Sequence, residues 1–240
     1  MDASLQGPAC RLCGETVTRT YCPNCGQKLS AKRITLPDLL HEVFHFFTHL
    51  DKGFPYTLKQ LVKATGRMQK EYLEGDRSRH QKPFSMFFIS ATLSALVYYW
   101  VNRTLLQYWN AGDQHEAEFF NHYWVVLHSC LLPLYTLITY LCFRKAGYFY
   151  GEIAVFQLYT FSIVLLALAL LQTGKFIEPS LETRYIEVPL LLGYTTVTNL
   201  RFFSRLKRLP IVLLSILNIG LTFLVAAIVQ DALIQWLYKS

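Results

Sequence analysis

The sequence predicts an all-α membrane protein with about five transmembrane helices, preceded by a small four-cysteine ribbon and amphipathic cytoplasmic helices. Hydrophobic residues make up 52% of the 240 residues and charged residues only 16%, which is unusual for a soluble domain. After residue 83, long apolar segments alternate with short polar connections, and four of the six cysteines lie in the first 25 residues. We therefore expect a ribbon at 1–30, a basic helical platform at 31–83 and a helical bundle at 84–240.

Five segments are long and apolar enough to cross a hydrocarbon layer about 30 Å thick, which takes about 20 helical residues. They are Phe84–Leu106, Tyr123–Phe143, Ile153–Gln172, Tyr185–Leu200 and Pro210–Gln230. The fourth is the shortest and contains Pro189 and Gly193. It fits either a kinked span or a re-entrant segment that is buried among its neighbours.

The distribution of cationic residues predicts the orientation of these spans, because Lys and Arg collect in cytoplasmic loops. Residues 1–83 hold 13 of the 23 Lys and Arg, and the connections at 144–145 and 201–208 hold six more. The opposite side holds four. The first 30 residues contain no apolar stretch of signal-peptide length. We therefore expect five spans, with the N-terminus in the cytoplasm and the C-terminus outside.

The four N-terminal cysteines form two C-x-x-C pairs, each followed by glycine: Cys10 and Cys13 in CRLCG, then Cys22 and Cys25 in CPNCG. Each pair can direct two thiolates at one metal ion, and the glycine permits the tight turn that this requires. The spacing predicts a zinc ribbon with structural Zn²⁺, because four cysteine ligands leave no open coordination position. An iron site or a redox switch is the alternative. Cys130 and Cys142 lie in an apolar segment, and we expect buried thiols there.

A histidine-rich helix is expected between residues 35 and 53. His41, Glu42 and His45 match H-E-x-x-H, the pattern that places two zinc ligands and a general base on one helix face. His49 continues the four-residue spacing. Three ligands from one straight helix converge poorly on a single ion, and no other third ligand is evident. We favour a polar helix face, with a noncatalytic metal or proton site and a hydrolase centre as alternatives.

The sequence predicts a second helix after Pro55, with a capping box at Thr57–Gln60 and a break or bend at Gly66. Its polar side and its connection to the first span carry a group of cations that we expect to contact anionic lipid or phosphate: Lys63, Arg67, Lys70, Arg77, Arg79 and Lys82. Each such charge near the membrane surface contributes about 1 kcal/mol of attraction. A general positive anchor is favoured over a specific phosphate or lipid site.

The order of these motifs resembles an uncharacterised bacterial membrane protein family, the domain of unknown function 3667 family. The resemblance rests on CRLCG, CPNCGQ, HLDKGF, YTLKQL and EYLEGDRSRHQKPFSMF, and covers roughly residues 10–95. The positions that match the family motif are Asp51, Lys52, Gly53, Arg77 and Pro83. Where the family usually has proline before the glycine of the second helix, this chain has Thr65. The resemblance implies a zinc ribbon followed by a multi-span bundle, with no established reaction.

These features favour a nonenzymatic function: an assembly, interaction or transport component of the bacterial inner membrane. Its expected partners are a lipid bilayer with anionic headgroups and a cytoplasmic or membrane protein. Arg11, Arg19 and Lys28 give the ribbon too thin a basic surface to favour nucleic acid. One alternative is a membrane-bound zinc metallohydrolase that uses the H-E-x-x-H residues. Another is a small-solute or lipid transporter with its site near Pro189, Gly193 and the neighbouring threonines.

Overall fold

The structure is a computed structural model, and it describes residues 9–10, 13–17, 20–26, 37, 53–108 and 123–238. The α-helices assigned in order are α2 (Phe54–Lys63), α3 (Arg67–Glu74), α4 (Pro83–Tyr108), α6 (Val125–Cys142), α7 (Tyr150–Gln172), α8 (Arg184–Phe202) and α9 (Arg208–Tyr238). Two 3-10 helices, η3 (Arg144–Ala146) and η4 (Thr173–Phe176), follow α6 and α7. The described residues contain no strand, apart from an isolated antiparallel bridge between Ala9 and Thr16. The predicted all-α class is confirmed.

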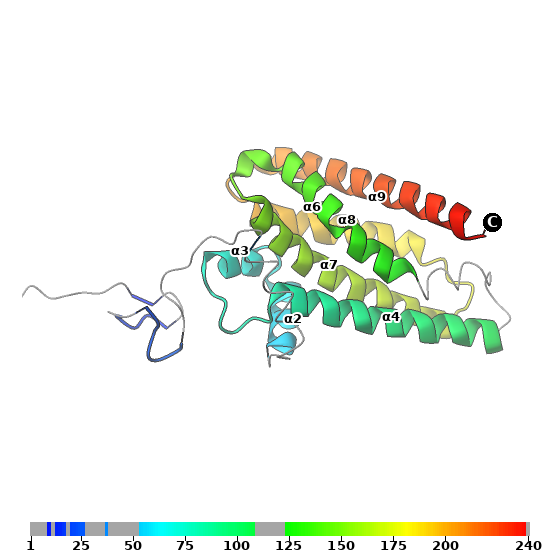
Figure 1. The fold of residues 1–240 in the computed structure, drawn as a ribbon, viewed down its shortest axis with the longest axis horizontal. Coiled ribbons are helices and arrows are strands. Elements are labelled where there is room, and N and C mark those ends of the chain that lie inside the picture. Colours follow the sequence, from blue (N-terminus) through cyan, green and yellow to red (C-terminus); the bar gives the residue numbers. More distant parts are fainter. Residues whose placement is uncertain are drawn as a thin grey trace, which may run out of the picture.

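Successive helices of the bundle run in alternating directions (Figure 1). The starts of α4, α7 and α9 and the ends of α6 and α8 therefore lie together, at the end that also carries α2 and α3. We call this the platform end. The C-terminus lies at the opposite end. The connections after α6 and α8, with their Lys and Arg residues, are thus at the platform end, as the distribution of charge predicts.

Four described helices are long and apolar enough to cross a membrane: α4, α6, α7 with its extension η4, and α9. Their most apolar windows have mean hydropathies between 1.5 and 2.6. Helix α8 has 19 residues, so its length fits the predicted fourth span, but it is not among the four. Its interior Pro189 is accommodated within one continuous helix. Whether α8 crosses the membrane stays a prediction.

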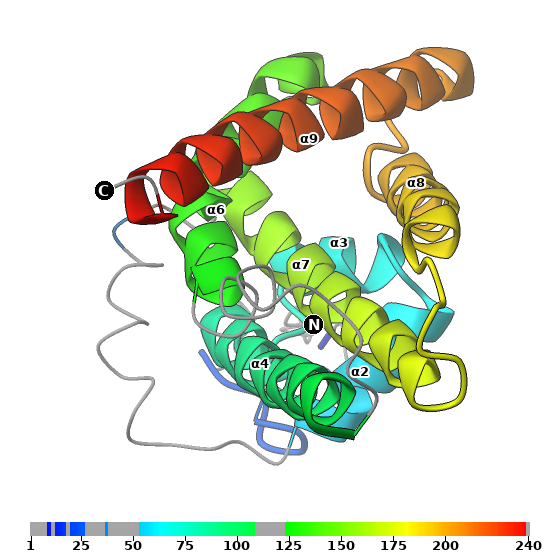
Figure 2. The same ribbon diagram turned by 90° about the vertical axis from the view of Figure 1, so that its right-hand side faces the viewer.

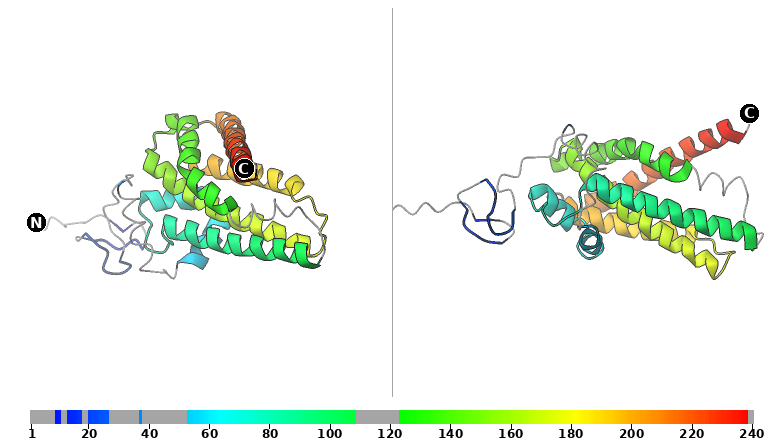
Figure 3. Two further views of the ribbon diagram at one scale, coloured as in Figure 1. Left: turned by 45° about the vertical axis from the view of Figure 1, so that its right-hand side comes forward. Right: turned by 60° about the horizontal axis from the view of Figure 1, so that its bottom comes forward.

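Helix α7 lies at the centre of the bundle, surrounded by α4, α6 and α8 (Figure 2). In its most apolar window, 72% of the residues are buried, against 17% in α9. Figure 3 shows α9 along the outer side of the bundle. Near the platform end, Phe143 after α6, Phe156 of α7, and Phe202 and Phe203 at the end of α8 belong to a second buried cluster, the aromatic cluster. Phe143 and Phe203 stack there with their ring centroids 4.0 Å apart.

Polar side chains inside the bundle hydrogen-bond between helices. Gln157 Nε2 of α7 donates to Thr139 Oγ1 of α6 at 2.7 Å, and Thr139 donates to Asn218 Oδ1 of α9 at 3.1 Å. Asn199 of α8 likewise donates to Ser215 of α9 at 2.9 Å. Such bonds satisfy groups that would be costly to leave unpaired in an apolar environment.

Helices α2 and α3 form a hairpin that packs on α7 and α8. In its turn, the Thr65 hydroxyl lies 2.6 Å from Thr198 Oγ1 and donates to the Tyr194 hydroxyl at 3.0 Å, both on α8. In α3, Gln69 Nε2 donates to Thr160 Oγ1 of α7 at 3.0 Å. The hairpin is therefore attached to two bundle helices through buried hydrogen bonds.

Two local predictions are wrong. Helix α2 begins at Phe54, so Thr57 is an interior residue and not a cap; its hydroxyl instead accepts the backbone N–H of Gln81 at 2.8 Å. Cys130 is exposed on α6, whereas Cys142 is half-buried against the aromatic cluster. An apolar segment does not reveal which of its faces is turned outward, and this is why the expected burial of Cys130 failed.

Candidate metal centre and basic pocket

The four N-terminal cysteines converge on one point. Their sulfur atoms all lie within 4.8 Å of one another. Two contacts join a cysteine of the first C-x-x-C pair to a cysteine of the second. Cys10 Sγ lies 3.6 Å from Cys25 Sγ, and Cys13 Sγ lies 3.5 Å from Cys22 Sγ. Four sulfurs around a tetrahedral Zn²⁺ with Zn–S bonds of about 2.3 Å would be about 3.8 Å apart. The arrangement therefore fits a metal ion of this size.

The two C-x-x-C pairs share the same closing hydrogen bond and the same conformation of the following glycine. Gly14 N–H donates to Cys10 O and Gly26 N–H donates to Cys22 O, both at 2.9 Å. The two glycines have φ values of +76° and +72°, a region that other residues enter only at a cost. The glycine predicted to close each turn is thus required by its backbone conformation. Among the described residues of this segment, the buried apolar cluster consists of Cys10, Val17 and Cys22, with Cys25 packed against it.

The predicted histidine stripe, His41, Glu42, His45 and His49, lies outside the described residues. The noncatalytic site and the hydrolase centre proposed there accordingly remain predictions. Among the described residues, the four cysteines are the group of potential metal ligands that come together.

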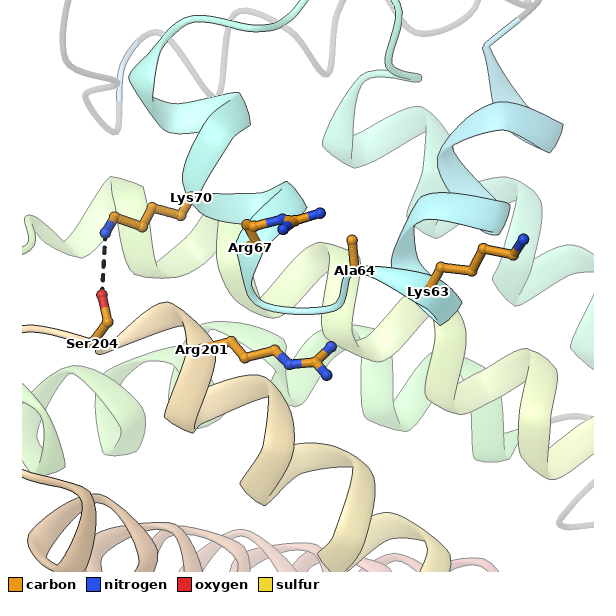
Figure 4. A pocket seen from close by; sticks show the side chains of 6 residues that line it. All are labelled: Lys63, Ala64, Arg67, Lys70, Arg201 and Ser204. Carbon is orange, nitrogen blue, oxygen red and sulfur yellow. Dashed lines mark hydrogen bonds between the residues drawn. The ribbon is translucent and has the colours of Figure 1, made fainter.

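A second feature lies where the hairpin meets the end of α8. An open pocket of about 460 Å³ is lined by Lys63 and Ala64 of α2 and its cap, Arg67 and Lys70 of α3, and Arg201 and Ser204 at the end of α8 (Figure 4). Lys70 Nζ donates to Ser204 Oγ at 3.1 Å. The lining of the pocket is dominated by cations and also includes the buried Ala64.

The six predicted phosphate-contacting cations divide into groups. Lys63, Arg67 and Lys70 line the pocket, whereas Arg79 and Lys82 are exposed outside it. Arg77 is half-buried, and its guanidinium donates to the carbonyl oxygens of Tyr72 at 3.2 Å and Leu73 at 3.5 Å. These bonds satisfy carbonyl groups in the last turn of α3, as cations near helix C-termini commonly do.

Sequence reasoning did not assign Arg201 and Ser204 to any site. Lys70 and Ser204 are 134 residues apart in the chain, and no local pattern links them. Gly66 was the one sequence signal of this contact with α8, since an unusual backbone angle or a close contact often requires glycine. It has φ +75°, and a Cβ there would overlap the Thr198 carbonyl oxygen and lie 2.8 Å from Arg201 Cβ.

Three positions of the family motif build the junction between hairpin and bundle. Gly53 precedes α2 and packs so closely that a Cβ would lie 2.8 Å from Gln81 N and 3.0 Å from Arg79 O. Arg77 satisfies the end of α3, and the buried Pro83 begins α4. The close approach of the backbone accounts for glycine at 53, and the carbonyl groups at the end of α3 account for arginine at 77.

The predicted transporter site is not supported by the position of its residues. Pro189 and Gly193 are exposed on α8, and a Cβ on Gly193 would have no atom within 4 Å. Thr198 is instead buried and bonded to Thr65 of the hairpin.

Comparison with known proteins gives one family match. No curated protein and no solved structure matches the chain. The matched segment, residues 51–95, covers α2, α3 and half of α4, and therefore includes the hairpin, four of the six pocket residues and the junction around Gln81. Residues 51–95 match the model of an uncharacterised family, described as a protein of unknown function (DUF3667), and this confirms the family resemblance in that segment.

Proposed function

We propose that this chain is a nonenzymatic multi-pass membrane protein, an assembly, interaction or transport component, whose N-terminal cysteines hold one structural Zn²⁺ on the cytoplasmic side. The observation that carries the metal assignment is the convergence of four sulfur atoms within 4.8 Å of one another. The membrane assignment is supported by four helices of sufficient length and apolar character.

A closed set of four thiolates favours a structural role. Such a set saturates the tetrahedral coordination of Zn²⁺ and leaves no position for a substrate or a reactive water. The buried residues around the cluster are Cys10, Val17 and Cys22, too few to stabilise a separate unit by apolar burial. Metal binding would therefore supply the free energy that folds this segment.

The platform end supports a cytoplasmic orientation and a role at the membrane surface. It gathers the hairpin and the connections after α6 and α8, and with the N-terminal region these carry most of the Lys and Arg residues. Cationic segments of this kind are retained in the cytoplasm and attracted to anionic lipid. A ribbon and a basic platform on one side suit docking of a protein partner at the lipid surface.

Metal analysis of the purified full-length protein tests the proposal. We expect about one zinc per chain, and its loss in Cys10→Ser, because three thiolates bind Zn²⁺ far more weakly than four. Cys130→Ser is the matched control: it also removes a cysteine, but from the exposed face of α6, and should retain the metal. Zinc at the wild-type level in Cys10→Ser would refute the proposed site.

A further inference from the structure

The basic pocket has the composition of an anion-binding site. Its lining supplies two guanidinium groups, two ammonium groups and the hydroxyl of Ser204, with no carboxylate. Guanidinium and ammonium groups only donate hydrogen bonds, and the fork of Arg matches two oxygens of a phosphate. The volume of about 460 Å³ falls in the range of about 300–1,000 Å³ that is usual for ligand sites.

The charges in this pocket are only partly compensated by the protein. Arg67 forms an ion pair with Glu71 at 3.5 Å, and both side chains are well exposed. Among the described residues, the side chains of Lys63 and Arg201 have no hydrogen-bond or ion-pair partner. In the view of Figure 4, Lys70 extends away from the other three cations, toward Ser204. A cleft lined by one sign of charge concentrates counter-ions of the opposite sign.

The hairpin and α8 are held together at this pocket by structure that does not depend on its charges. Thr65 contacts Thr198, one turn before Arg201, and the absence of a side chain on Gly66 lets the turn approach α8 closely. Cations from two distant parts of the chain are thus brought together by buried contacts. This is the specific geometry that distinguishes a site from a general positive anchor.

We propose that Lys63, Arg67 and Arg201 bind the phosphate of an anionic lipid headgroup in this pocket, whose lining Lys70 and Ser204 complete. The pocket lies at the platform end, and Val197, one helical turn before Arg201, is an exposed apolar residue on α8. Residues four apart share a helix face, so an exposed apolar side chain lies next to Arg201, on the side that leads along α8 away from the platform end. An amphiphile with a phosphate head fits both features. A soluble phosphate ester has the same phosphate group but no acyl chain that could contact this apolar side chain.

Lipid binding to the purified full-length protein tests this inference, which rests on the proposed membrane function. The probe is dioctanoyl phosphatidic acid, titrated in detergent and followed by native mass spectrometry; dioctanoyl glycerol, which lacks the phosphate, is the neutral control. The pocket pair Lys63→Gln/Arg201→Gln is compared with the control pair Lys59→Gln/Lys207→Gln. Both pairs remove two exposed charges at the platform end, one from α2 and one from α8 or the connection that follows it, but Lys59 and Lys207 do not line the pocket.

We expect saturable binding of phosphatidic acid that the pocket pair weakens about tenfold or more and the control pair less than about threefold, because charged hydrogen bonds are lost only in the first. Equal weakening in both pairs, or no saturable binding, overturns the site. Displacement of the lipid by an equal concentration of inorganic phosphate supports the phosphate site but overturns lipid as its source.

Control measurements separate the pocket from the proposed function. Each variant is checked for monodisperse elution and for zinc content, and Ser204→Ala provides a second, smaller change at an exposed pocket residue. Failure of lipid binding with zinc and membrane extraction intact refutes the pocket alone. A protein recovered outside the membrane refutes the function on which the pocket depends.

Discussion

The backbone of Gln81 is held by two side chains from distant parts of the chain. Its N–H donates to Thr57 Oγ1 of α2 at 2.8 Å, and its carbonyl accepts the Tyr159 hydroxyl of α7 at 2.6 Å. Gln81 is fully buried, and its side-chain amide atoms have no partner among the described residues. At the scale of single residues, buried hydroxyls therefore fix the connection between the hairpin and α4.

Beside Gln81, His80 is 6% exposed and packs against Tyr56 and Tyr72, with ring centroids 5.2 Å and 6.3 Å away. Desolvation lowers its pKa below the ordinary value of 6.5, and Arg79 lowers it further, while Asp76 acts in the opposite direction. The folded protein consequently keeps this ring neutral at a pH where the unfolded chain already binds a proton.

This difference predicts a pH dependence of stability. At pH values above the unfolded pKa of 6.5, the ring is neutral in both states and contributes no slope. As the pH falls from there toward the lower folded pKa, the free energy of unfolding should decrease by up to about 1.4 kcal/mol per pH unit. His80→Phe keeps an aromatic ring and should remove this part of the decrease. Thermal unfolding at pH 7.5 and 5.5 measures it, and an unchanged decrease in the variant would contradict the assignment.

At the scale of elements, the hairpin shows what a sequence pattern predicts and what it leaves open. Gly66 predicted a bend, and it separates α2 from α3 with φ +75°. The six predicted cations form no single surface, however, because Arg77 turns back to the end of α3. Helix periodicity relates residues a few positions apart. It contains no information about α8, more than 100 residues away, which contributes Arg201 and Ser204 to the pocket.

Gly66→Ala should destabilise the protein by about 2 kcal/mol or more, because a Cβ at positive φ is strained and would also overlap the Thr198 carbonyl oxygen. The free energy of unfolding can be followed by detergent-denaturant titration of the purified protein. Gly193→Ala is the matched control within α8: its Cβ meets no atom within 4 Å, so it should be neutral or stabilising by up to about 1 kcal/mol. Equal effects of both substitutions would argue against the close approach.

At the scale of the whole molecule, the alternating helices place the basic connections at one end. The Lys and Arg counts predict this grouping at one end, while the side of a membrane that it faces stays a prediction. The alternation also makes the direction of α8 opposite to that of α7 and α9. An antiparallel helix of 19 residues is long enough for a span of about 20 residues. The polar residues of α8 argue only weakly against a span, because two of them are already hydrogen-bonded inside the protein. Asn199 bonds to Ser215 of α9, and Thr198 bonds to Thr65 of the hairpin.

Reporter fusions test this topology. Alkaline phosphatase, which needs an oxidising compartment to form its disulfides, should be active when fused at Glu178 or at the C-terminus and inactive when fused at Lys145. The reason is that residues 144–145 lie at the basic platform end, whereas residue 178 follows η4 at the opposite end. Activity at Glu178 combined with inactivity at the C-terminus would show that α8 does not cross the membrane.

The sequence by itself determined the all-α class, the cysteine pairs with their turn glycines and the positions of the apolar helices, since each depends on composition or on spacing within a short segment. Only the tertiary structure decided that α7 is central and α9 peripheral: the mean hydropathies of their most apolar windows are 2.3 and 2.6, yet the buried shares of these windows are 72% and 17%. In a membrane, a helix surface that faces lipid and one that faces other helices are similarly apolar. The basic pocket likewise required the fold, because it joins residues that only packing brings together.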